Sequence, residues 1–182
     1  MFDPPDRFVA GTIGQPGDRT FFLQARDGVR VVSVVLEKAQ VAVLAERLGE
    51  LLAELDRRGV TAAAPEASGP PGDDVAPLDE PLNEAFRAGS LTLGWDGEAE
   101  RVLLEARAES AEGEAIDPDE DDDDDEDGPD LLRVLITPQA ARAFAVRAAR
   151  IVSAGRPPCP ICGNPLDPQG HICPRRNGRY LN

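Results

Sequence analysis

Four residues near the end of the chain could bind a metal ion: Cys159, Cys162, His171 and Cys173. They comprise all three cysteines and the only histidine of the 182 residues. The spacing Cys-x2-Cys, then eight residues, then His-x-Cys is typical of a structural zinc site, in which one tight turn presents two thiolates and a second pair completes a tetrahedron. Four protein ligands leave no coordination position for water or substrate. The sequence therefore predicts a structural zinc ion.

The alternative is that these residues are unrelated members of a disordered tail. The segment 157–182 has too few apolar residues to bury a core without metal, which favours a zinc-knuckle tail. Such a tail would display a small set of partner-binding side chains: Arg175, Arg176, Arg179 and Tyr180. These arginines could contact an acidic partner, form a solvated basic end, or meet the protein's own acidic run.

Two strand-rich segments with similar patterns precede the tail. In the first, 7–13 and 20–26 are apolar stretches around the turn residues Pro16 and Gly17, and 29–36 is rich in β-branched residues. Apolar residues at three- and four-residue intervals then predict an amphipathic helix over 38–58, ended by Gly59.

The second segment repeats this order. Alternation predicts strands over 91–96 and 101–109 around Asp96-Gly97, and 131–136 is a further apolar strand. A helix follows, with Thr137 as N-cap and Pro138 at its first position. Its buried stripe is predicted to be Ala140, Phe144, Ala148 and Ile151.

The implied fold is α+β, with two β-β-β-α units, antiparallel sheet or sheets, and two helices packed on one face. We expect a body over 1–156, divided into a first unit (1–59), a linker (60–80) and a second unit (81–156), followed by the tail over 157–182. Whether the two units share one sheet is left open by the sequence.

A run of ten acidic residues between 117 and 127 accounts for most of the net charge of −15, so the remaining chain carries only −5. That balance disfavours general binding to nucleic acid and leaves room for a local basic site. The like charges predict a disordered loop over 111–130 that acts as a spacer. A sharper possibility is that the loop competes for a basic surface made of Arg142, Arg147 and Arg150.

No catalytic motif is apparent. With His171 and the thiols committed to metal, no Ser-His-Asp or Cys-His arrangement can form, and no phosphate-cradling glycine loop is present. We therefore expect a non-enzymatic protein-protein interaction adaptor. The alternative is an enzyme that acts on a small or phosphorylated ligand through carboxylates and arginines in a cleft between the halves. The absence of a signal peptide and of a long apolar run predicts a cytoplasmic protein.

Three stretches carry a resemblance to a known family: "MFDPPDRFVAGTIGQPGDRTFFLQA" at 1–25, the strand-to-helix passage 34–52, and 136–178 with its CxxC and HxC pairs. In these the chain resembles an actinobacterial family catalogued as a conserved domain of unknown function. The resemblance implies a cytosolic actinobacterial protein and carries no activity. It also implies an alternative role, as a regulatory partner of a chromosome-partitioning ATPase.

Overall fold

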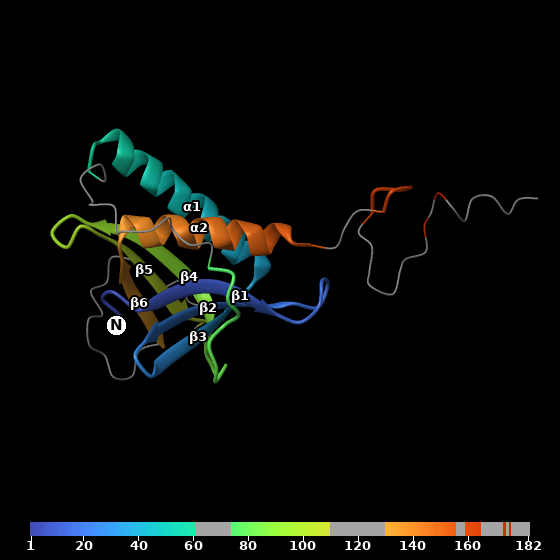
Figure 1. Cartoon of the computed structure of the whole chain (residues 1–182), viewed down its shortest axis with the longest axis horizontal. Helices are drawn as coiled ribbons and strands as arrows, with labels where there is room; N and C mark the ends of the chain where they lie inside the picture. The colour runs from blue at the N-terminus through green and yellow to red at the C-terminus, as the bar shows by residue number, and fades with distance from the viewer. Residues whose placement is uncertain (61–73, 110–129, 156–158, 165–172, 174, 176–182) are drawn as a thin grey trace, which may run out of the picture.

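A computed structural model describes residues 1–60, 74–109, 130–155, 159–164, 173 and 175. Six strands and two helices follow one another along this part of the chain (Figure 1). In order they are β1 (Arg7–Ile13), β2 (Thr20–Asp27), β3 (Arg30–Leu36), α1 (Lys38–Arg57), β4 (Glu84–Asp96), β5 (Arg101–Ala108), β6 (Leu131–Ile136) and α2 (Pro138–Ser153).

All six strands pair in the order β1-β2-β3-β4-β5-β6, so the two halves share one sheet. Neighbours within each half are antiparallel, as the sequence predicts, whereas β3 and β4, which join the halves, are parallel. The α+β class and the two repeated units are therefore confirmed, and the sheet as a whole is mixed.

The outer edges of this sheet also approach one another. Phe2, just before β1, forms a parallel bridge to Val134 of β6. Its N–H donates to the Arg133 carbonyl at 3.0 Å, and its carbonyl accepts from the Leu135 N–H at 2.9 Å. The segment that leads into one edge strand thus covers part of the other edge, which would otherwise offer unpaired backbone groups.

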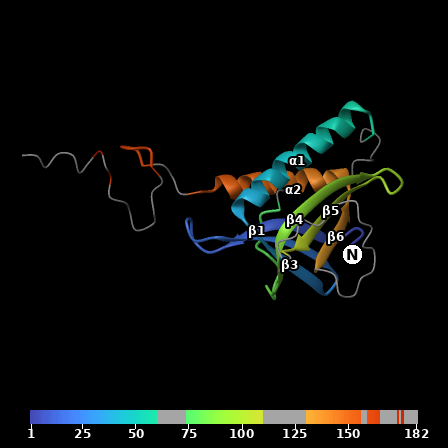
Figure 2. The same ribbon diagram turned by 180° about the vertical axis from the view of Figure 1, so that it is seen from behind.

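Both helices lie on the same face of the sheet, in contact with each other (Figures 1 and 2). Thr137 is the N-cap of α2, and its side chain accepts a hydrogen bond from the Ala140 N–H at 3.1 Å. The core lies between the helices and the sheet. There the Phe144 ring of α2 stacks on the Phe8 ring of β1, with centroids 4.8 Å apart.

The stripe predicted for α2 is partly wrong. Phe144 and Ala148 are buried, but Ala140 is exposed, Ile151 is half-buried, and the buried set includes Ala141 and Arg147 instead. An apolar periodicity cannot reveal a buried arginine, because the residue type itself indicates the surface.

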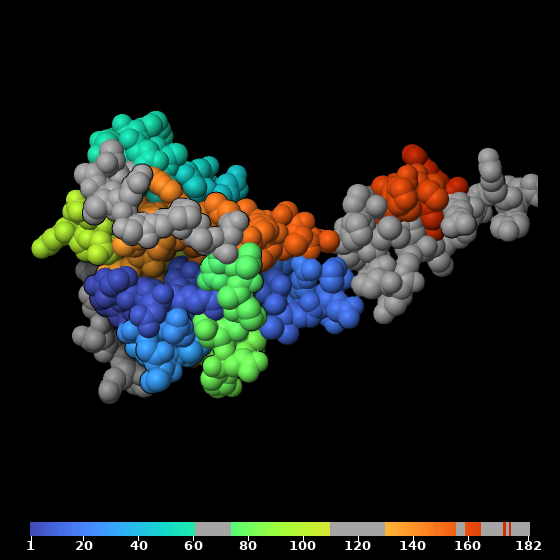
Figure 3. All heavy atoms as spheres, in the orientation of Figure 1, coloured from blue at the N-terminus to red at the C-terminus, as the bar shows by residue number. Residues whose placement is uncertain are grey.

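The opposite face of the β1-β2-β3 half is covered by residues 74–82, which we call the covering segment. Figure 3 shows it lying across these strands. Leu78 and Leu82 pack on Val9, Phe22 and Val35 in a second, smaller apolar cluster. Gly11 makes room for this contact, because a Cβ there would lie 2.5 Å from the Leu78 side chain. The end of the expected linker is therefore packed against the body.

Polar contacts hold the covering segment in register. The buried Gln24 amide donates to the Asp79 carbonyl at 3.0 Å and accepts from the Asp79 N–H at 2.7 Å. The guanidinium of Arg7 binds Asp74 and Asp79, each at 2.7 Å. Hydrogen bonding and charge from Asp74 raise the pKa of Arg7, and the Arg7 hydrogen bond is the main cause that lowers the pKa of Asp74.

Arg147 reaches this segment from α2. Its guanidinium donates to the Ala10 carbonyl of β1 at 2.7 Å, to the Ala76 carbonyl at 2.8 Å and to Asp74. Burial lowers the pKa of Arg147, and the charge of Asp74 opposes that effect. One buried side chain thus joins the last helix, an edge strand and the covering segment.

The three arginines considered as a docking surface for the acidic run form contacts within the body. Arg147 is buried, Arg150 donates to the Asp74 carbonyl at 3.2 Å, and Arg142 pairs with Asp56 of α1 at 2.6 Å. The acidic run itself lies outside the described residues, as does the predicted loop over 111–130 except its last residue, Asp130.

Candidate metal site

The first two cysteines lie on one tight turn. Within it, the Gly163 N–H donates to the Cys159 carbonyl at 2.8 Å, and the Cys159 N–H donates to the Asn164 carbonyl at 2.7 Å. Gly163 has a φ of 78°, in the left-handed region that favours glycine, so the residue directly after Cys162 allows the chain to reverse there. This closed turn is what brings the two cysteines of the Cys-x2-Cys pair together.

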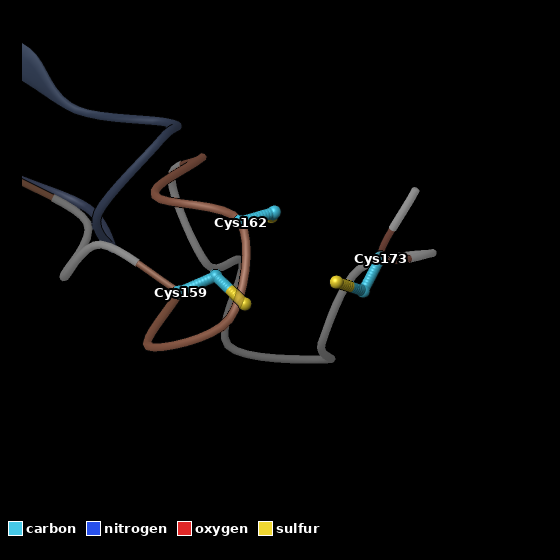
Figure 4. Close-up of side chains that lie close together, drawn as sticks. All are labelled: Cys159, Cys162 and Cys173. Carbon is cyan, nitrogen blue, oxygen red and sulfur yellow. The ribbon is translucent and has the colours of Figure 1, made fainter. Parts of the chain in front are cut away.

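Cys173 approaches this turn from a separate part of the chain (Figure 4). The three sulfur atoms lie within 4.8 Å of one another, and Cys159 and Cys173 are buried while Cys162 is half-buried. Zinc–sulfur bonds of about 2.3 Å in a tetrahedron place sulfurs about 3.8 Å apart. The observed spacing is close to that, so small side-chain movements would complete a three-thiolate set.

The pKa values of the two thiols of this turn are shifted in opposite directions. The N–H groups of Cys162 and then Ile161 are the largest causes that lower the pKa of Cys159. Burial is the largest cause that raises the pKa of Cys162, although the Asn164 N–H opposes it. Backbone N–H groups directed at a sulfur stabilise its thiolate, which is the form that binds metal.

Of the other five predicted site residues, the structure describes only Arg175. His171, Arg176, Arg179 and Tyr180 lie outside the described residues. Arg175 is exposed, and its guanidinium donates to the Ile161 carbonyl of the cysteine turn at 3.2 Å. The structure therefore brings three of the four predicted metal ligands together and places one basic residue beside them.

Three clustered thiols of this kind can bind a metal ion, and their coordination chemistry favours soft or borderline metals. The protein belongs to the family described as "Protein of unknown function (DUF3090)". The family model matches residues 1–173, which include the whole body and all four predicted ligands, and it ends at Cys173. No curated protein and no solved structure matches the chain.

A second site was not singled out from the sequence. A pocket of about 280 Å³ is lined by Pro16, Gly17, Arg19, Phe21, Lys38, Ile151, Val152 and Gly155. Its described lining residues include no carboxylate, whereas the cleft considered for an enzyme would combine carboxylates with arginines. Its two cations are far apart in the sequence, and only the approach of α1, α2 and the β1–β2 turn brings them to one place. None of the described helices is long and apolar enough to cross a membrane.

Proposed function

We propose that this protein is a zinc-binding, non-enzymatic adaptor whose metal-stiffened tail binds another protein. The observation that carries the metal part is the cluster of Cys159, Cys162 and Cys173, with all sulfurs within 4.8 Å. His171 lies between Cys162 and Cys173 in the sequence and would supply the fourth ligand. Three thiolates and one imidazole suit zinc, which prefers a tetrahedron of sulfur and nitrogen ligands.

Metal analysis of the protein purified without added metal or chelator tests this assignment. We expect about one zinc per chain, because the chain has cysteines and histidine for one closed set only. Replacing zinc with cobalt(II) should give the visible absorption of a tetrahedral thiolate complex. C162S should lose the metal and H171A should bind it more weakly, while I161S, in the same turn, should retain it. A metal-free wild-type protein that also fails to bind added zinc would refute the proposal.

The adaptor role follows from the chemistry that such a site permits. A zinc ion with four protein ligands has no open position for a substrate, and all thiols and the imidazole are then occupied. Zinc would instead fix the segment that carries Arg175, Arg176, Arg179 and Tyr180. Arginine and tyrosine are enriched among residues that anchor protein interfaces, since each combines apolar area with directed hydrogen bonds.

Affinity capture from the native host tests the adaptor role. The double variant R175A/R176A should lose the main partner while it retains zinc and its melting temperature. R57A/R58A is the matched control, because it removes two adjacent exposed arginines from the end of α1. Equal recovery of the partner by both double variants would exclude this surface. Recovery of a partitioning ATPase would identify the alternative partner named above.

A further inference from the structure

The pocket at the end of α2, next to Gly155, has the features of a ligand site whose lining residues do not include the cysteines. Figures 1 and 2 both show the start of α1, the end of α2 and the β1–β2 turn at the same end of the body. Lys38 begins α1, Arg19 lies in the turn, and Ile151 and Val152 belong to the last turn of α2. Three elements that are distant in sequence therefore build this pocket.

Two cations of the pocket lack the partners that other cations of the body have. Arg7, Arg142 and Arg147 all pair with aspartates. Within the described part of the chain, neither Arg19 nor Lys38 forms an ion pair. The Arg19 side chain donates to the Ala154 carbonyl at the end of α2, yet its buried Nε has no hydrogen-bond partner there. In a protein with a net charge of −15, two cations that form no ion pair with any described residue and share one pocket make a local site for an anion.

The rest of the lining determines what kind of anion fits. Phe21, Ile151 and Val152 supply an apolar wall beside the cations. A pocket with an apolar wall and a few directed polar groups suits a ligand with an apolar body and a charged end. The end of α2 also reaches this pocket, and its last carbonyl groups carry partial negative charge. A singly charged carboxylate is therefore favoured over a phosphate dianion.

We propose that this pocket binds a carboxylate carried on a short apolar group. Arg19 and Lys38 hold the carboxylate, and Phe21, Ile151 and Val152 contact the apolar part. Two sources have this chemistry: a free aliphatic acid, and an acidic side chain next to an apolar one in a partner protein. None of the lining residues belongs to the cysteine cluster, so a test of this pocket does not depend on whether the protein binds zinc.

The single lysine provides a direct probe. Reductive methylation with ¹³C-formaldehyde labels Lys38 and the N-terminal amine and keeps the positive charge of both. Titration of the full chain with hexanoate should shift the Lys38 signal to saturation, whereas hexan-1-ol and sodium chloride at matched ionic strength should not. Acetate should bind at least about tenfold more weakly than hexanoate, because it lacks four methylene groups and burial of two of them already corresponds to a factor of about ten. Acetyl-Leu-Asp-Leu-amide represents the second source, an acidic side chain in a partner protein. Whichever of hexanoate and this peptide binds more tightly identifies the source of the carboxylate.

Two substitutions assign the effect to the pocket. R19Q should weaken hexanoate binding by about fivefold or more, and R19K should restore part of it. R47Q is the matched control, since Arg47 is an exposed cation of α1 paired with Glu50 outside the pocket. If R19Q disturbs the fold, K38Q replaces it, and hexanoate binding is then followed by the backbone amide shifts of residues 17–21 and 151–155. C162S should bind hexanoate as the wild type does.

Several results would overturn the proposal. One is that neither hexanoate nor the peptide shifts Lys38; another is that R19Q and R47Q bind equally well. Tighter binding of hexyl phosphate than of hexanoate would refute the assignment of a carboxylate. A shift that sodium chloride reproduces would show that only general ionic screening had been detected.

Discussion

The body and the cysteine turn are stabilised in opposite ways. In the body, apolar side chains from all six strands and both helices are buried in one core, with Phe144 2% exposed and Leu23 fully buried. In the turn, the described contacts are short-range hydrogen bonds and three clustered thiols, and the neighbouring Ile161 is 47% exposed. The body is thus built to fold by hydrophobic burial, whereas the turn offers chiefly a place for metal.

Because the body and the cysteine turn are stabilised differently, they should respond independently to substitution. A change in the core should unfold the body, and a change in a cysteine should alter metal content alone. The covering segment is intermediate, because it combines an apolar contact through Leu78 with charged contacts to Arg7 and Arg147.

The largest effect is expected from F144A. Phe144 is buried and stacks on Phe8, so its truncation removes apolar contacts and leaves a cavity that should cost about 3–5 kcal/mol. Urea denaturation followed by circular dichroism measures this loss. V146A on the same helix is the control, since Val146 is 59% exposed and should change stability by less than about 0.5 kcal/mol. Equal effects of the two would mean that α2 does not pack as described.

The next largest effect is expected from R147M. Methionine keeps much of the apolar volume but cannot donate to the carbonyls of Ala10 and Ala76, which leaves polar groups unpaired at a loss of about 3 kcal/mol. Protease cleavage within the covering segment should also accelerate. R142M removes an exposed pair with Asp56 and should cost about 0.5 kcal/mol. If R147M were as stable as R142M, the Arg147 contacts would contribute nothing measurable to holding the covering segment.

Arg147 also marks the limit of what the sequence could predict. The strands of the first half, both helices and the Thr137 cap were predictable because each has a local pattern: alternation, a helical period, or a cap before proline. The start of β4 could not be predicted in this way. Residues 84–90 contain small and charged residues without clear alternation, and their parallel pairing with β3 is a long-range contact. Neither this pairing nor a buried arginine has a local signature.

The two candidate sites differ in the same respect. Cysteine spacing predicted that Cys159, Cys162 and Cys173 would come together, since metal-binding turns are short and local. Arg19 and Lys38 lie in separate elements, and only the packing of α1 against α2 and the β1–β2 turn brings them to one pocket. A site assembled by tertiary packing could not be recognised from spacing.

A smaller effect, on the pH dependence of stability, is expected from D74N. The pKa of Asp74 is lowered in the folded protein, chiefly by the hydrogen bond from Arg7. The stabilisation by this carboxylate is therefore fully present above the pKa of an unfolded aspartate, about 3.9, and is lost as the pH falls through the lower, folded-state value. D74N should be less stable at neutral pH and should lose less stability on acidification. Parallel wild-type and D74N curves of unfolding free energy between pH 6 and about pH 2.5 would contradict this.

The smallest effect on the body is expected from C162S. Zinc binding to the tail should depend on Cys162, while the core of the body contains none of the three cysteines. The melting temperature of the body should therefore shift by less than about 1 °C, since a shift of several degrees requires about 1 kcal/mol. Adding a chelator to the wild type should have the same outcome, with zinc released and the near-ultraviolet spectrum of Trp95 in β4 unchanged. Global unfolding of C162S or of the chelated protein would show that the tail and the body form one cooperative unit.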